Sequence, residues 1–126
     1  MRRKRGFTLI ELMVVLSIIA TLAMLAMPKY LHSVERSREA ALRHDLHAMR
    51  DAIDKFLADR GRYPTTLEEL AEMRYLRSVP RDPVTDSSTT WLVDPPPEGA
   101  ATRDGIYDVH SGADGNGLDG TPFQQW

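Results

Sequence analysis

The sequence begins MRRKRG, residues 1–6, and runs directly into FTLIELMVVLSIIATLAMLAMP, residues 7–28. Residues 7–27 are predominantly apolar, and Glu11 is the only charged residue among them. As an α-helix this run is about 32 Å long, enough to cross the hydrocarbon core of a bilayer. Because a carboxylate inside a membrane segment is costly, Glu11 indicates a specific use of this helix.

Basic residues around the apolar run predict its orientation. Arg2, Arg3, Lys4 and Arg5 precede it, and only Lys29 follows it closely. The positive-inside tendency therefore keeps the N-terminus in the cytoplasm and translocates the rest of the chain. A secretory signal peptide would have a shorter apolar region of roughly 7–15 residues ending in a small-residue cleavage site. A retained signal anchor is the better general interpretation.

The string Gly6-Phe7-Thr8-Leu9-Ile10-Glu11 resembles the processing motif of type IV pilins and of the pseudopilins of type II secretion. The resemblance implies that a membrane-embedded prepilin peptidase cuts after Gly6. It also implies that Phe7 becomes the N-terminal residue of the mature chain and is N-methylated.

The same resemblance gives roles to three further residues. Glu11 matches the assembly glutamate of the family, which pairs with the N-terminal amine of a neighbouring subunit in the filament. An unpaired buried charge would cost several kcal/mol, so such a partner is needed once the helices leave the lipid. Thr8 has either an assembly role or simply a hydrogen bond to the helix backbone. Pro28 lies where the family has a helix-kinking proline.

The helix is expected to continue far beyond the membrane segment. No glycine lies between Gly6 and Gly61, and Pro28 is the only strong helix breaker in that interval. Gly61 suits a helix C-cap, so one helix is predicted over residues 7–60. Its second half has one apolar face, with side chains three or four positions apart: Leu42, Leu46, Met49, Ile53, Phe56 and Leu57.

Residues 62–126 are expected to form a small globular part. Thr65 with Glu68, and Thr66 with Glu69, are overlapping capping boxes that predict a short helix to about residue 73. Residues 89–93 and 106–110 are the best strand candidates, separated by a proline-rich loop.

The predicted fold class is therefore α+β. A long N-terminal helical stem, kinked near Pro28, would carry a small C-terminal domain of a short helix and antiparallel strands. The expected divisions are a cleaved leader at 1–6, a transmembrane and filament-core helix at 7–28, the second half of the stem at 29–61 and a periplasmic globular part at 62–126.

The globular part resembles the major, G-type pseudopilin of type II secretion. The resemblance rests on residues 62–66, the Asp82-Pro83 turn, residues 107–115 and Trp126. It is weak over residues 84–103, where the tryptophan and glycine that follow Asp-Pro in that type are replaced by Val84 and its successors.

The glycine-rich loop at residues 111–120 is a candidate calcium site. The chain has no cysteine, so no disulfide can staple a domain this small. Four glycines in the loop let oxygen atoms converge, and hard oxygen ligands suit calcium. The G-type pseudopilins carry calcium in the equivalent loop. We expect Asp114 and Asp119 as side-chain ligands, with Ser111 or Asn116 adding oxygens. The alternative is a turn rich in glycine and Asx residues that caps a hairpin.

Other chemistry is poorly represented. His44 and His47 are three positions apart on the predicted helix, but no third metal ligand is evident, and His32 and His110 belong to no pattern. No nucleophile elbow, phosphate loop or zinc spacing occurs, so we expect no catalytic activity. The net charge of −2 would become −6 once the leader takes four basic residues, which argues against nucleic acid as a partner.

These observations predict a structural subunit of a type II secretion pseudopilus. It would wait in the inner membrane and then polymerise into a periplasmic filament that drives protein export. Its expected partners are membrane lipid before assembly, the prepilin peptidase, the inner-membrane assembly platform, identical subunits and minor pseudopilins. A pilin of an extracellular type IV pilus remains the alternative, with a non-polymerising, membrane-anchored binding domain as a third interpretation.

Overall fold

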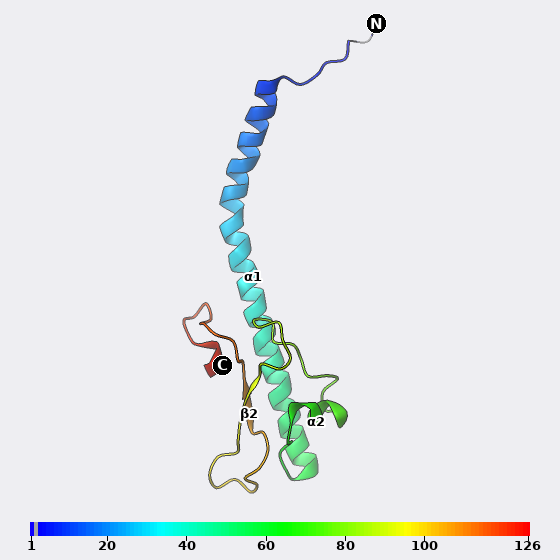
Figure 1. The fold of residues 1–126 in the computed structure, drawn as a ribbon, viewed down its shortest axis with the longest axis vertical. Helices are drawn as coiled ribbons and strands as arrows, with labels where there is room; N and C mark the ends of the chain where they lie inside the picture. The colour runs from blue at the N-terminus through cyan, green and yellow to red at the C-terminus, as the bar shows by residue number, and fades with distance from the viewer. Residues whose placement is uncertain (2) are drawn as a thin grey trace. The chain divides into compact units, whose positions relative to one another are not determined.

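The computed structural model describes residue 1 and residues 3–126, which divide into two compact units at residues 1–35 and 36–126. A long helix, a short helix and two antiparallel strands confirm the predicted α+β class. In chain order the elements are α1 (Leu9–Arg60), α2 (Leu67–Glu72), β1 (Leu92–Asp94), β2 (Asp108–His110) and the 3₁₀ helix η1 (Phe123–Gln125) (Figure 1).

Helix α1 begins and ends where the sequence predicts, to within two residues. Its C-terminus is set by Gly61, whose φ of 69° lies in the left-handed region that glycine adopts without strain. The Gly61 N–H donates to the carbonyl oxygen of Leu57 at 2.8 Å and so satisfies one of the last carbonyls of the helix. The helix runs through Pro28, which removes one main-chain hydrogen bond, and the kink there stays a prediction.

In the first unit, the apolar side chains of α1 over residues 9–31 are all exposed, with no protein packed over them. The most apolar window of 18 residues has a mean hydropathy of 2.5, and none of it is buried. By length and composition this helix can span a membrane. An exposed apolar surface of this extent needs lipid or another protein against it.

In the second unit, one face of α1 forms half of the hydrophobic core. Leu42, Leu46, Met49, Ile53 and Phe56 are buried as predicted, whereas Leu57 is half-buried. The ring of Phe56 meets Tyr75 edge-on, with 5.2 Å between ring centroids. The side chains that pack against this face come from α2, the strands and the loops: Leu67, Leu70, Trp91, Ile106, Val109, Ala113 and Phe123.

Helix α2 has the predicted cap in a modified form. Thr66 is the N-cap, and its hydroxyl accepts from the Glu69 N–H at 3.1 Å. The Glu69 carboxylate returns to the N–H of Thr65, at 2.7 Å, rather than to that of Thr66, and it also accepts from Arg62 at 2.6 Å. Only one of the two predicted boxes is thus used, because Glu69 serves both threonines.

The two strands pair antiparallel, with Val93 opposite Val109, but each is shorter than predicted. Prolines at positions 95–97 have no N–H to continue a ladder beyond Asp94. Before Leu92 the chain lies very close to Gly112, where an added Cβ would stand 1.9 Å from the Thr90 carbonyl oxygen. Only glycine at position 112 allows this close approach. Before Leu92 this contact replaces further strand pairing.

The Arg62–Glu69 ion pair predicts a pH-dependent stability. The Arg62 guanidinium, followed by the Thr65 N–H, lowers the pKa of Glu69 from 4.5 to about 2. A lowered carboxyl pKa adds stability above the unfolded value, and this stability is lost as the pH falls from 4.5 to about 2. We therefore expect the Tm of the full-length chain in detergent to fall more steeply over this range than that of Glu69→Gln. The exposed neighbour Glu68→Gln should keep the wild-type slope, and parallel curves for wild type and Glu69→Gln would refute the role of the pair.

Candidate functional site

Thr8 and Glu11 form a reciprocal capping box at the start of α1. The Thr8 N–H and hydroxyl both donate to Oε2 of Glu11, at 2.9 and 3.1 Å. In return, the Thr8 hydroxyl accepts from the Glu11 N–H at 3.2 Å. Thr8 precedes the first helical residue, Leu9, and Glu11 is the third, so the two side chains satisfy donors that every helix N-terminus leaves open. Within one subunit, the acid of the apolar segment thus has a local partner.

The chain around the predicted cleavage point lies outside the helix and is exposed. Phe7 has a relative solvent exposure of 92%. A Cβ added to Gly6 would meet no atom within 4 Å, so the fold itself does not require glycine there. A requirement for glycine at this position would therefore come from a molecule that recognises the exposed chain.

The hydroxyl groups within the apolar segment are satisfied by the helix itself. Ser17 donates to the carbonyl oxygen of Met13 at 2.7 Å, and Thr21 donates to that of Ser17 at 2.8 Å. Because these bonds use both hydroxyl donors, neither side chain needs a water molecule as its acceptor. The segment is therefore suited to an apolar environment on all sides.

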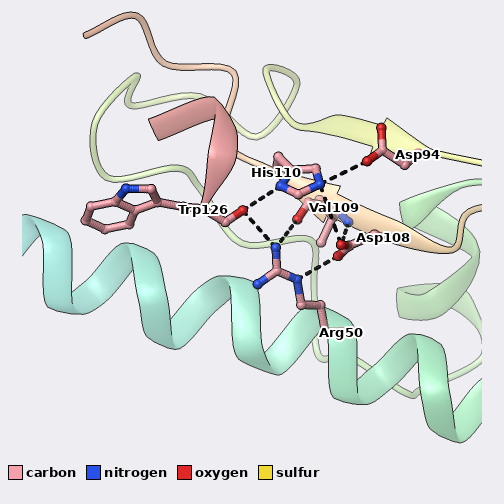
Figure 2. A network of polar contacts seen from close by, with 6 residues as sticks. All are labelled: Arg50, Asp94, Asp108, Val109, His110 and Trp126. Atoms are coloured by element: carbon pink, nitrogen blue, oxygen red, sulfur yellow. Dashed lines mark hydrogen bonds and ion pairs between the residues drawn. The ribbon is translucent and has the colours of Figure 1, made fainter. Parts of the chain in front are cut away.

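In the second unit, Arg50 of α1 joins the helix to β2 and to the C-terminal residue (Figure 2). Its Nε donates to Oδ1 of Asp108 at 2.7 Å. One terminal nitrogen donates to the carbonyl oxygens of Val109 and Trp126, both at 2.8 Å. The planar guanidinium presents several donors in fixed directions, which lets one side chain hold three acceptors.

His110 extends this network, although no sequence pattern predicted a role for it. Its Nδ1 lies 2.5 Å from the Trp126 carbonyl oxygen, and its Nε2 lies 2.9 Å from Oδ2 of Asp94 (Figure 2). Both ring nitrogens therefore contact oxygen atoms, one on the C-terminal residue and one on β1. The network links β1, β2 and the C-terminal residue to one helix.

The four residues predicted to bind calcium have different surroundings. Ser111 is fully buried, and its hydroxyl donates to Oδ2 of Asp82 at 2.5 Å. Asp119 lies half-exposed beside Arg43, 3.5 Å from the guanidinium nitrogen. Asp114 and Asn116 are exposed, and Asn116 pairs as an isolated β-bridge with Pro122. Calcium binding stays a prediction.

A second metal possibility gains no support. His44 and His47 are both exposed on α1. Across residues 1 and 3–126, no three side chains of His, Cys, Asp or Glu gather closely enough to hold a metal ion.

Sequence patterns did not predict the roles of two charged residues in the second unit, Glu39 and Arg50. Glu39 is buried and accepts from the Leu118 N–H at 2.5 Å, and Arg50 holds β2. Both belong to the helix face that carries the core, at the spacing of Leu42 and Leu46. That spacing was the available signal, because a charged residue inside an apolar stripe needs a buried partner.

Comparisons with known proteins show a matching family model and several similar proteins. Residues 1–27 match the model of the prokaryotic N-terminal methylation motif. The type II secretion system core protein G of Klebsiella pneumoniae is 35% identical over 99 residues, covering 66% of this chain and 71% of that protein. The core protein G of Escherichia coli (strain K12) is 34% identical over 97 residues, covering 64% and 67%.

One relative of another kind covers less. The type IV major pilin of Myxococcus xanthus (strain DK1622) is 38% identical over 68 residues, covering 54% of this chain and 31% of that pilin. No solved structure gave a significant match.

The Arg50 network predicts a loss of stability on mutation. Arg50→Met keeps roughly the length of the side chain but removes the guanidinium hydrogen bonds to Asp108 and to the carbonyl oxygens of Val109 and Trp126. We expect the free energy of unfolding to fall by about 2 kcal/mol, the scale of hydrogen bonds to a charged group. Urea unfolding of the full-length chain in detergent, followed by near-UV circular dichroism, measures the change. The matched control is Lys55→Met, which removes an exposed pair with Asp51 and should cost about 0.5 kcal/mol or less. Equal losses in the two variants would show that Arg50 is an ordinary surface residue.

Proposed function

The chain belongs to the family of the type II secretion system core protein G, and we propose that it is a structural subunit of a type II secretion pseudopilus. In this proposal the subunit is made as a precursor anchored in the inner membrane. It is then cleaved and polymerised into a periplasmic filament that drives protein export. The observation that carries the proposal is the exposed apolar segment at residues 7–27, in which Glu11 is the one carboxylate.

Two environments in succession account for this surface. Before assembly, lipid covers the apolar side chains, and Thr8 satisfies Glu11 near the end of the span. After assembly, the same side chains pack on other copies. Each large apolar side chain taken out of water contributes about 1.5–3 kcal/mol, so a surface of this size favours a permanently covered state.

Cleavage between Gly6 and Phe7 supplies what the filament needs. The exposed chain is accessible to a peptidase, and the unrestricted space around Gly6 supports recognition by the enzyme as the reason for glycine. Cutting there makes Phe7 the N-terminal residue and creates a basic amine. Glu11 can then exchange its Thr8 partner for the amine of the adjacent subunit, which sets one subunit in register against the next.

Orientation and partners follow from the same segment. The basic leader keeps the N-terminus in the cytoplasm and places residues 36–126 in the periplasm. We propose the prepilin peptidase, the assembly platform, identical subunits and minor pseudopilins as partners. The relatives that show the family are named as core proteins of a secretion system, which supports a structural role without catalysis.

An extracellular type IV pilus is the second candidate. The similarity to the Myxococcus pilin favours it, but the match covers only 31% of that pilin. The matches to core protein G cover about two thirds of those proteins, so they favour secretion.

Cleavage after Gly6 and methylation of Phe7 predict a defined change in the mass of the chain. In cells that contain a prepilin peptidase, Gly6→Val should stay at precursor mass, whereas the wild-type chain loses residues 1–6 and gains one methyl group on Phe7. Intact-mass spectrometry measures both species. Arg5→Lys keeps the charge of the leader and should be processed normally. A Gly6→Val chain of mature mass would refute the cleavage site.

The assembly role of Glu11 predicts a loss of filaments without a loss of subunit. Glu11→Gln should be cleaved and inserted in the membrane as well as wild type. It should nevertheless give at least roughly tenfold fewer sedimentable filaments, because the charge pair between subunits is gone. Ser17→Ala, which removes only a bond within the helix, should assemble normally. Normal yield from Glu11→Gln would contradict the role of the acid.

A further inference from the structure

The C-terminal loop, defined here as residues 111–122, is attached to one face of α1 by two charged side chains. Oε1 of the buried Glu39 accepts from the Leu118 N–H at 2.5 Å. The Arg43 guanidinium lies 3.5 Å from Oδ2 of Asp119 and stacks 4.1 Å from the ring centroid of Trp126, just beyond the loop. Glu39, Arg43 and Arg50 recur at helical spacing, so all three serve the same end of the chain.

Within the loop, Asp119 already has partners for both carboxylate oxygens. Oδ1 accepts from the N–H and the hydroxyl of Thr121, at 3.0 and 2.6 Å, while Oδ2 faces Arg43. The Thr121 hydroxyl also accepts from Nε1 of Trp126 at 2.8 Å. The Thr121 hydroxyl and N–H, helped by Arg43, lower the pKa of Asp119. The carboxylate is thus the centre of a hydrogen-bonded unit that closes without an ion.

Gly117 of the loop also has a structural role that involves no metal. A Cβ added to Gly117 would stand 2.3 Å from Cζ2 of Trp126. Glycine at this position therefore lets the indole pack against the loop, where it also meets Phe123 edge-on at 5.1 Å between centroids. The indole thus contacts both the loop and the Arg43 guanidinium.

The donor set fits this arrangement better than it fits calcium. Calcium takes six to eight oxygen ligands at about 2.3–2.6 Å. Here the Ser111 hydroxyl is committed to Asp82 inside the core, away from solvent. A cation bound to Asp119 would stand beside the fixed positive charge of Arg43.

We propose that Arg43 takes the place of a calcium ion in this chain, holding the C-terminal loop through Asp119 and Trp126. The loop is then ordered without calcium. If the function proposed above is right, the filament built from this chain also assembles without calcium.

The direct test is the melting temperature of the full-length chain in detergent, with about 10 mM calcium chloride or with a chelator. That concentration exceeds the Kd of weak extracellular calcium sites by roughly tenfold. We expect the two Tm values to agree within about 1 °C. A calcium site with a Kd of about 0.1 mM would raise the Tm by roughly 10 °C or more, and such a rise would overturn the proposal. No filament is needed, so this result is independent of the assembly experiments.

A second measurement tests Arg43 itself. Arg43→Gln should lower the Tm by roughly 3–5 °C, equally with calcium and with chelator, and should shift the Trp126 indole N–H resonance in a ¹⁵N-correlated spectrum. Arg43→Lys keeps the charge but loses the stacked plane, so its indole signal should move in the same direction. The exposed control Arg77→Gln, outside α1, should leave both readings unchanged. An unaltered Tm and indole signal in Arg43→Gln would refute the proposal.

Discussion

The structure depends most on one constraint, which is that the apolar surface of α1 cannot remain in water. Its hydrophobic side chains are exposed over residues 9–31, and each large one costs about 1.5–3 kcal/mol if it stays hydrated. Satisfied hydroxyl groups and a long interval without glycine make this surface a continuous helix. We propose that lipid covers this surface before assembly and that neighbouring subunits cover it afterwards.

The proposed move from lipid to filament gives a reason for the presence of Glu11. Inside one subunit it belongs to a capping box with Thr8, a local arrangement that any helix of this sequence can form. The capping box explains how the acid is tolerated in the precursor, but not why an acid is present in an apolar segment. In the filament we propose, a partner on another subunit would provide that reason, since it would turn a cost within the membrane into a register for assembly.

Local patterns in the sequence predicted most of the fold. The limits of α1, its end at Gly61, the core face from Leu42 to Phe56 and the short helix α2 all follow from periodicity and capping. The strand limits did not, because the close approach of Thr90 to Gly112 joins residues far apart in the chain.

Long-range contacts also account for the parts of the site that were missed. Arg50 bonds to Asp108 across 58 positions, and Glu39 bonds to Leu118 across 79, so neither partner is visible in a local pattern. His110 was assigned no role for the same reason. The glycine-rich loop shows a further limit, since glycines that suggest converging ligands also allow an indole to pack closely.

Photo-cross-linking from the middle of the apolar segment tests whether lipid covers this surface first and other copies of the chain cover it later. A benzophenone amino acid at Ile18, exposed in the single subunit, reports what covers the helix in each state. We expect lipid adducts in the membrane fraction and cross-links to a second copy of the chain in sedimented filaments. Filaments that sediment normally but give no cross-link between copies at this position would contradict this expectation.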